Sequence, residues 1–447
     1  MSLVLSSLNV QTVLVGIVVI LLVYKLCQRW KYKLPPGPFA WPVIGNYEVI
    51  RAKFLHEIFA TYIKTYGPVF TVQLGPFQMV VLNDIESVTE ALVKRKADFA
   101  NRPYLPSLVK FSNGRKNIVF ANYTPTWKLH RKIAGKAFST ELDDPEFQHL
   151  MKIDREFTEM IGKGFVEDMF PIMLKIWTTQ KYRKITEIFE ETTEIFRQKL
   201  KEHEKSFNRD NIRDFTDSLI LARQEAEDEE DKEVISQLTD THLVQTLSDI
   251  FGAGIDTSRI TLYFGVCYMA GLPEIQAKVH EEIDRVVGKN RLPGVSDREN
   301  LSFTDATLHE VMRLGTAVPV GIPHSTLCDS KVGGYDVPED TIVMINHWAL
   351  HHDPNYWKDV DKFDPTRFLD EKNKLARKPE SWLPFSAGRR VCLGESVAKP
   401  ELHIMFASIM QRFKISLPEG TTPELEIAGG GTVAQPAPFK IIVEERK

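Results

Sequence analysis

The stretch Pro384–Gly394 reads PFSAGRRVCLG and contains Cys392, one of only four cysteines in the 447 residues. Four scattered cysteines do not form a disulfide framework or a CxxC zinc site. A lone cysteine is most often a small buried hydrophobic residue, but the neighbours of this one follow the pattern F-x-x-G-x-R-x-C-x-G. Average residue usage makes a chance match in such a chain an event on the order of 1 in 10,000. We therefore expect Cys392 to have a chemical role.

This pattern resembles the loop with which the cytochrome P450 family binds the iron of its haem. The resemblance implies that Cys392 is the axial ligand of haem b (iron protoporphyrin IX), because a thiolate ligand favours cleavage of the O–O bond. It also implies that Phe385 shields the sulfur from water and that Arg390 pairs with a haem propionate. Gly388 and Gly394 would permit a tight turn and a close approach of the backbone to the porphyrin.

A second motif, FGAGIDTS at residues 251–258, lies inside the longest candidate helix, Asp240–Leu272. Two glycines and a consecutive acid and alcohol lower helix propensity, so we expect them to serve a function. A nucleotide-binding glycine loop is a poor alternative, because no strand precedes the motif and the third glycine is missing. In the cytochrome P450 family this pattern lies over the haem. The resemblance implies that Ala253 leaves space for dioxygen and substrate, and that Thr257 and Asp256 hydrogen-bond the oxygen and relay protons.

Five side chains are expected to hold the two haem propionates. Trp127 and Arg131 are four residues apart in TWKLHRK and would share one face of a helix. On their own they could be an exposed arginine stacked on a tryptophan. The resemblance implies instead that both reach a propionate, together with Arg102 in NRP, His324 in IPHST and Arg390.

Glu310 and Arg313 are three residues apart, which is the spacing of an ordinary surface pair on a helix. The cytochrome P450 family has a second arginine at the place that Arg367 occupies in FDPTRF. The resemblance implies that these three residues form a buried ion network behind the cysteine loop. Because burying charges is costly, such a network is expected to fix geometry more than to add stability.

The N-terminus predicts a membrane anchor. Val13–Tyr24 is an unbroken apolar run within an almost uncharged segment, and about 20 residues of helix span a bilayer. Lysines and arginines follow it directly, so the positive-inside rule places the rest of the chain in the cytosol. A cleavable signal peptide would carry its positive charges before the apolar run. We expect residues 1–30 to be a single anchor in the endoplasmic reticulum membrane and residues 31–447 to be one cytosolic catalytic domain.

The remaining sequence predicts a mainly α fold with small β-sheets, as the resemblance to the helical cytochrome P450 fold implies. Pro68–Leu82 reads as a β-hairpin around Gly75 and Pro76, and a final helix is expected from Glu395 to Phe413. The acidic run Glu225–Glu233 is interpreted as a solvated linker between two helices.

The chain departs from the family in two places. Leu314-Gly315-Thr316 lacks the arginine and proline that the family usually has there, which is expected to loosen the chain beside the substrate pocket. Two helices of the family also have no counterpart between about residues 138 and 145. Their absence is expected to expose two apolar faces, one on the Asp240–Leu272 helix and one on the helix after the cysteine.

The expected activity is insertion of one oxygen atom of dioxygen into a lipophilic substrate. The segments GRKNIVFANYTPTWKLHRK and DIFGAGIDT resemble most the steroid 17-alpha-hydroxylase/17,20-lyase members of the family. We therefore expect a steroid-like substrate first. Asp249, Asp154 and Arg155 are candidate contacts for polar groups of the substrate. A xenobiotic or aryl-hydrocarbon hydroxylase is the alternative within the same chemistry. Two further alternatives do not share this chemistry. One is a haem-thiolate isomerase that needs no reductase, and the other is a truncated haem-binding membrane protein without catalysis.

The chain has no flavin or nicotinamide fingerprint, so the electrons must come from a partner. The resemblance implies NADPH-cytochrome P450 reductase, with cytochrome b5 as a second partner. The docking surface is expected on the cysteine side, near Lys128, Lys132, Arg389 and Lys399. A net charge of −4 gives no sign of a nucleic-acid-binding surface.

Overall fold

The computed structural model describes residues 15–16, 19–20, 23, 31–134, 145–161, 164–421, 427–430 and 433–446. The anchor predicted at residues 1–30 lies almost wholly outside these residues. So does the segment from residue 135 to residue 144, which contains most of the place where two helices were expected to be missing. Within the described parts of the chain, none of the helices combines the length and the apolar character that crossing a membrane requires.

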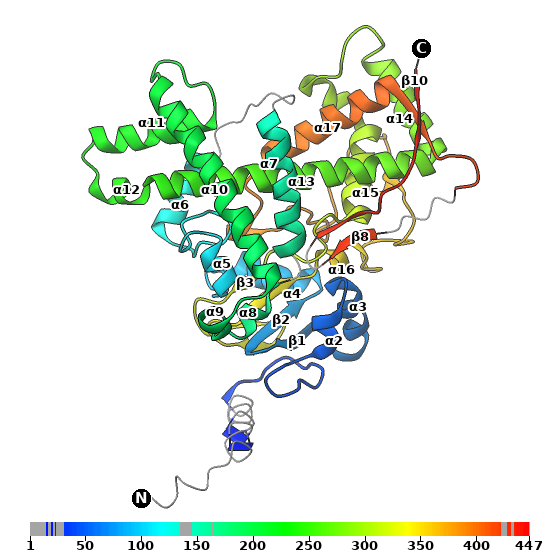
Figure 1. Ribbon diagram of the computed structural model, residues 1–447. Helices are drawn as coiled ribbons and strands as arrows, with labels where there is room; N and C mark the ends of the chain where they lie inside the picture. The colour runs from blue at the N-terminus through cyan, green and yellow to red at the C-terminus, as the bar shows by residue number, and fades with distance from the viewer. Residues whose placement is uncertain are drawn as a thin grey trace, which may run out of the picture.

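The described chain is mainly helical, as predicted, and is organised around one long helix. Helix α13, Asp240–Gly271, has 32 residues and passes through the middle of the molecule (Figure 1). Its N-terminal half contributes Leu243 and Leu247 to one apolar core, and its C-terminal half contributes Phe264 and Met269 to another. Burial on most sides explains why this sequence is apolar around most of the helix.

Three helices pack against α13 and position the residues discussed below. Helix α10, Gln180–Ser206, shares the first core with the N-terminal half of α13. Helices α15, Ser302–Gly315, and α17, Glu395–Arg412, share the second core with its C-terminal half. The cysteine loop leads directly into α17, so the packing of α17 on α13 helps to fix the position of the loop.

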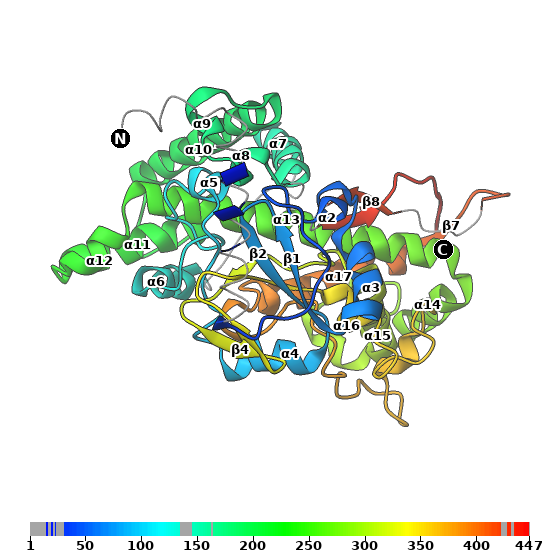
Figure 2. The ribbon, with the colours of Figure 1, turned by 90° about the horizontal axis from the view of Figure 1, so that it is seen from below.

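The predicted hairpin is confirmed. Strands β1, Val69–Leu74, and β2, Phe77–Leu82, pair antiparallel around Gly75, which has a positive φ of 56°. Strand β6, Ile342–Ile345, pairs parallel to β2, and β3, His324–Ser325, completes a sheet in the order β1-β2-β6-β3. Figure 2 shows the hairpin beside α2 and α3, which cover it with apolar side chains.

The remaining elements complete the fold. The other α-helices are α2 (Tyr47–Arg51), α3 (Leu55–Tyr66), α4 (Ile85–Thr89), α5 (Pro106–Lys110), α6 (Pro125–Ala134), α7 (Pro145–Ile161), α8 (Val166–Met169), α9 (Met173–Ile176), α11 (Phe215–Asp228), α12 (Lys232–Gln237), α14 (Pro273–Val286) and α16 (His347–His351). The π and 3-10 segments are η2 (Glu90–Lys94), η3 (Val295–Asn300), η4 (Pro365–Phe368) and η5 (Gly388–Arg390). The other strands are β4 (Ser330–Val332), β5 (Tyr335–Val337), β7 (Phe413–Ser416), β8 (Ile427–Gly430), β9 (Val433–Pro436) and β10 (Ile442–Glu445).

The acidic run Glu225–Glu233 is not a linker. Helix α11 continues to Asp228, and only three residues separate it from α12, which begins at Lys232. The Asp231 side chain accepts hydrogen bonds from the first backbone N–H groups of α12. The acidic residues therefore form the end of one helix and the cap of the next, and their negative charge favours the N-terminal end of α12.

The departure at Leu314-Gly315-Thr316 does not loosen the chain. A Cβ atom on Gly315 would lie 2.8 Å from Cγ of Phe264, so this glycine lets α15 pack closely on α13. Thr316 adopts a left-handed conformation, and its hydroxyl is hydrogen-bonded to the Arg313 carbonyl and to Nδ1 of His351 at 2.9 Å. The expectation was wrong because close packing and a side-chain hydrogen bond hold this turn in place of the usual residues.

Only one of the two apolar faces expected to be exposed carries exposed large side chains. On α17, Val397 is 57% exposed and Met405 is 41% exposed. In the described α13, none of the large apolar side chains is exposed. The expectation for α13 was wrong, since neighbouring helices, α10 among them, pack against it.

Candidate functional site

The cysteine loop is held by backbone contacts that the sequence did not reveal. The Cys392 N–H donates to the Phe385 carbonyl at 2.9 Å, which closes the loop before α17. Gly388 has a φ of +74°, and a Cβ atom there would lie 1.9 Å from the carbonyl oxygen of Leu92 in η2. The close approach that requires this glycine is therefore to Leu92. At Gly394, by contrast, a Cβ atom would meet open space.

The Cys392 thiol lies where several groups act on its charge. It is accessible in the structure, but the surrounding protein still desolvates it and raises its pKa. The backbone N–H groups of Gly394 and Glu395, at the start of α17, and the charge of Arg131 act in the opposite direction. These donors favour a thiolate, which is the form that binds a metal.

One face of α13 has free space beside it. Ala253, Gly254 and Thr257 are exposed, although Asp256 and Ser258 beside them are buried. A Cβ atom on Gly254 would find no atom within 4 Å, and the Thr257 hydroxyl donates to the Ala253 carbonyl at 2.8 Å. Leu393 packs in the same apolar cluster as the α13 residues Ile250 and Phe251. The cysteine loop and the α13 residues just before Ala253 therefore pack against the same apolar core.

Three arginines gather beside this region without an acidic partner. Arg390 donates to the carbonyls of Ala100, Ile118 and Ala121 and lies 4.2 Å from the ring centre of Trp127. Arg131 lies 5.4 Å from the same ring and donates to the Val391 carbonyl at 2.6 Å. Arg102 donates to the Val119 carbonyl at 2.9 Å.

The charge of this arginine cluster is not compensated. Among the described residues, no carboxylate forms an ion pair with Arg102, Arg131 or Arg390. Burial and repulsion from Arg131 lower the pKa of Arg102 to about 9, and burial with repulsion from both neighbours lowers that of Arg390 to about 8. Burial lowers the pKa of Arg131 too. A ligand with two carboxylates would offset two of the three positive charges and accept hydrogen bonds from them, so the donor set fits the two propionates of a haem.

His324 and Trp127 already have protein partners. His324 on β3 is buried and its Nδ1 donates to the Phe99 carbonyl at 2.8 Å. Burial lowers its pKa to about 3, so the ring is neutral and its Nε2 carries no proton. His324 could donate to a carboxylate only after gaining a second proton. The Trp127 indole N–H donates to the Ile118 carbonyl at 2.8 Å.

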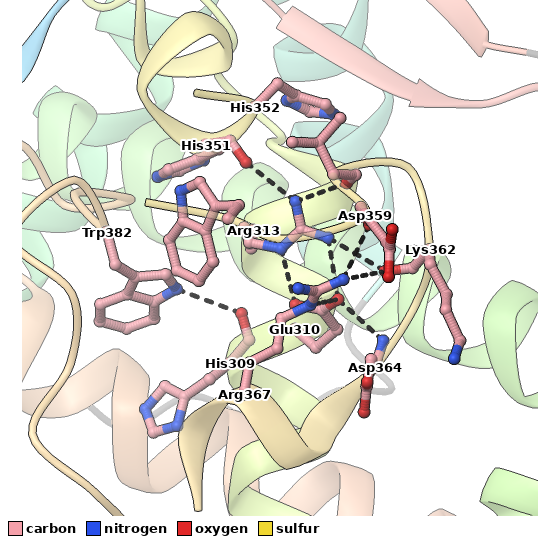
Figure 3. A network of polar contacts seen from close by, with 12 residues as sticks. His309, Glu310, Arg313, His351, His352, Asp359, Lys362, Asp364, Arg367 and Trp382 are labelled. Carbon is pink, nitrogen blue, oxygen red and sulfur yellow. Dashed lines mark hydrogen bonds and ion pairs between the residues drawn. The ribbon is translucent and has the colours of Figure 1, made fainter. Parts of the chain in front are cut away.

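The structure brings together the three residues expected to form an ion network (Figure 3). Nε of Arg313 lies 2.7 Å from Oε2 of Glu310, and Nε of Arg367 lies 3.3 Å from Oε1 of the same carboxylate. The side chains of Glu310 and Arg313 are 0% exposed. Arg313 also donates to the carbonyls of His351 and Val360, both at 2.8 Å. The network ties α15 to the chain that leads to the cysteine loop.

Asp249 contacts the protein rather than open space. Its carboxylate accepts hydrogen bonds from the Asn117 amide at 2.9 Å and from the backbone N–H groups of Ile118 and Val119. Burial raises its pKa to about 6, which these three donors oppose. The Ile118 carbonyl in turn accepts from Trp127 and Arg390. Asp249 therefore fixes the loop on which the arginine cluster rests, a role that local sequence does not indicate.

Asp256 has a partner that its sequence motif does not reveal. Nε of Arg259 lies 3.1 Å from Oδ1 of Asp256, and Nη2 of Arg259 donates to the Gln435 side chain of β9 at 3.1 Å. The separation of Asp256 and Arg259 by three residues on one helix is the sequence feature that could have predicted this ion pair. Asp154 and Arg155, named as possible substrate contacts, lie on α7, where Arg155 is exposed and Asp154 is partly buried.

Comparison with known proteins gives a consistent family assignment. A family model described as "Cytochrome P450" matches residues 35–141 and 137–443. The chain is 33% identical over 471 residues to a steroid 17-alpha-hydroxylase/17,20 lyase of Squalus acanthias, covering 93% of this chain and 92% of that protein. It is 30% identical over 511 residues to cytochrome P450 2U1 of Homo sapiens, covering 97% and 93%.

The same comparisons bear on the segment where two helices were expected to be absent, between about residues 138 and 145. The family match divides into two parts that overlap at residues 137–141, close to that segment. The alignment with the Squalus acanthias protein is longer, at 471 residues, than this whole chain of 447 residues. That relative therefore has residues without a counterpart here.

Proposed function

This chain belongs to the cytochrome P450 family and is a haem-dependent monooxygenase, and from this premise we propose that it hydroxylates a lipophilic, steroid-like substrate. The likeness to steroid 17-alpha-hydroxylase/17,20 lyases over 93% of the chain supports this substrate class. The open face of α13 at Ala253, Gly254 and Thr257 is apolar except for one hydroxyl, which suits an apolar substrate.

The uncompensated arginine cluster beside the Cys392 loop is the observation that carries this proposal. We propose haem b as the cofactor, in agreement with the family, and none of the four cysteines lies in the CxxCH motif of covalent haem attachment. Cys392 would hold the iron, and Arg102, Arg131 and Arg390 would bind the propionates. When bound, the haem supplies the oxygen-activating chemistry. Thr257 and Asp256 would hold and pass the protons that the reaction consumes.

The electron donor is proposed to be NADPH-cytochrome P450 reductase, with cytochrome b5 as a second partner. Lys128, Lys132 and Arg389 are exposed, and Lys128 and Arg389 both lie over the ring of Tyr123, at 4.8 and 5.4 Å. Lys399 forms an ion pair with Glu395, so it contributes less free positive charge. A cationic patch close to the cysteine loop would attract an acidic flavoprotein to the nearest surface.

The protein is proposed to lie on the cytosolic side of the endoplasmic reticulum membrane, anchored by residues 1–30, with residues 31–447 as the catalytic domain. Two exposed apolar groups support a membrane-facing surface. Phe39 is 73% and Trp41 is 57% exposed, and near α9 Ile176 is 78% and Trp177 is 57% exposed. Figure 1 shows α8 and α9 at the end of the molecule where the N-terminal segment joins the hairpin.

The carbon monoxide difference spectrum of the reduced, purified protein tests the proposal first. A thiolate-type Soret band is expected, and Cys392→Ser should abolish it. The exposed Cys328 supplies the control, since Cys328→Ser should leave the band unchanged. If the native chain lacks the band, it is a non-catalytic protein and the proposal fails.

Turnover tests the substrate and the partner. Steroids and aryl hydrocarbons are incubated with the protein, with and without reductase and NADPH. Hydroxylated steroid that appears only with both supports the proposal. Oxidation of aryl hydrocarbons alone would assign the xenobiotic alternative, and peroxide rearrangement without reductase would assign the isomerase.

A further inference from the structure

A carboxyl group that none of these roles uses lies directly on α13. A Cβ atom on Gly252 would lie 2.7 Å from Oδ1 of Asp154, which belongs to α7. The Asp154 carboxyl thus rests on the backbone of α13, and only a glycine leaves room for it. Gly252 precedes Asp256 by four residues, so both carboxyl groups lie along the same side of α13.

One guanidinium group forms an ion pair with Asp256 and acts electrostatically on Asp154. Arg259 forms its ion pair with Asp256 at 3.1 Å and is held from its other side by Gln435. Its charge also acts on Asp154, together with that of Asp256. Within the described residues, no donor forms a hydrogen bond with the Asp154 carboxyl. Two carboxyl groups and one arginine are electrically balanced if one of the carboxyl groups keeps a proton.

We propose that Asp154 and Asp256 share one proton and that Asp154 resupplies Asp256 after each proton that Asp256 passes towards Thr257. In this step the O–H bond of the Asp154 carboxylic acid breaks and a new O–H bond forms on the Asp256 carboxylate. The two electrons of the reaction still come from the reductase, so the step moves a proton only. Asp154 recovers its proton from solvent. This inference rests on the proposed function.

The charge of Arg259 keeps the free-energy cost of this proton transfer low. When Asp256 accepts the proton, its ion pair with Arg259 weakens and the Asp154 carboxylate becomes the counter-ion. The net charge of the three groups is the same before and after, so no additional charge is buried. Burial and the repulsion from Asp256 raise the pKa of Asp154 to about 7, against the effect of Arg259. A proton donor works best near the pH at which it operates.

Infrared spectroscopy of the purified ferric protein tests the shared proton without turnover. A carboxylic acid C=O band should disappear as the pH rises through about 7 and should be absent in Asp154→Asn. In Asp256→Asn the midpoint should move to lower pH, because the repulsion is gone. A band unaffected by Asp154→Asn, or a midpoint unchanged by Asp256→Asn, would overturn the inference.

The coupling of electron use to product tests the role in the reaction. In Asp154→Asn, product per NADPH should fall about tenfold, hydrogen peroxide should rise, and the pH dependence between pH 6 and 8 should flatten. Asp154→Glu should restore the coupling in part. The exposed Lys152 on α7 provides the control, because Lys152→Gln should keep the native coupling.

The outcomes separate this inference from the proposed function. If the native protein shows the thiolate-type band and NADPH-dependent product but Asp154→Asn is equally coupled, only the inference fails. It also fails if Asp154→Asn changes the dissociation constant of the substrate and leaves the coupling unchanged, since Asp154 would then be a substrate contact. If the native protein yields no product, the proposed function fails, while the infrared result still decides whether the two carboxyl groups share a proton.

Discussion

At the scale of single residues, two glycines of the cysteine loop show which positions the fold constrains. Its pattern is readable from the sequence, yet the two glycines in it differ in what they do. Gly388 is left-handed and touches a backbone carbonyl from another part of the chain, whereas Gly394 has a φ of −85° and open space around it. Glycine is therefore required at position 388, whereas position 394 has room for another residue.

Gly388→Ala should destabilise the protein by about 2–5 kcal/mol. A left-handed alanine costs about 1–2 kcal/mol, and its Cβ atom would displace the Leu92 carbonyl, with an overpacking cost of about 1–3 kcal/mol. The free energy of unfolding in urea gives the measurement. Gly394→Ala is the control and should cost at most about 1 kcal/mol, the effect of alanine at a helix N-cap. Equal effects of the two substitutions would contradict this account of the loop.

At the scale of elements, the buried ion network fixes α15 against the chain before the cysteine loop. Glu310 and Arg313 lie on one helix, so their pairing could be expected from spacing. The contribution of Arg367, more than fifty residues later, depends on how η4 packs on α15. The carbonyls of His351 and Val360 complete the coordination of Arg313, and no pattern in the sequence identifies them.

Glu310→Gln should lower the free energy of unfolding by about 3–5 kcal/mol, because it leaves two buried guanidinium groups without a counter-charge. Thermal unfolding monitored by circular dichroism measures the loss. The same substitution in an exposed pair is the matched control. Glu380 lies 4.0 Å from Arg377, and both side chains are mostly exposed, so Glu380→Gln should cost less than about 1 kcal/mol. A small effect at Glu310 would mean that the network does not hold this part of the fold.

At the scale of the whole molecule, α13 connects the parts of the site. Its face at Ala253 and Thr257 is open, and Asp256 pairs with Arg259. Asp249, seven residues before Asp256 on the same helix, anchors the loop at residues 117–119. That loop provides the Ile118 carbonyl to both Trp127 and Arg390. The charge cluster that fits the propionates is therefore positioned from α13, although none of its arginines belongs to that helix.

Asp249→Ala should weaken haem retention more than it changes the spectrum of the haem that remains. Three hydrogen-bond donors lose their acceptor, at a cost of about 1–3 kcal/mol for each buried group left unpaired. Haem content per purified chain and the rate of haem transfer to an acceptor protein measure the effect. Asn117→Ala removes one of the three bonds and should have a smaller effect. Full haem retention in Asp249→Ala would show that the loop holds its position without this anchor.

The sequence predicted the large features for physical reasons that are local. The hairpin at Pro68–Leu82 followed from two β-rich runs around Gly75 and Pro76, and the helix from Asp240 followed from its apolar length. It failed at the acidic run Glu225–Glu233, because charged residues form helices readily when a cap and a neighbouring helix are available. It also failed at Gly315 and Thr316, where Phe264 and His351 supply the missing packing and hydrogen bond.

The sequence alone indicated the family, the hairpin and the long helix, and it predicted Cys392 as the thiolate ligand, since each of these depends on residues close together in the chain. Only the tertiary structure decided that Gly388 meets Leu92, that Asp249 holds the loop under the arginines, and that Asp154 lies on Gly252. These contacts join residues far apart in the sequence. Their distances result from how helices pack in three dimensions, and no local pattern of residues encodes that packing.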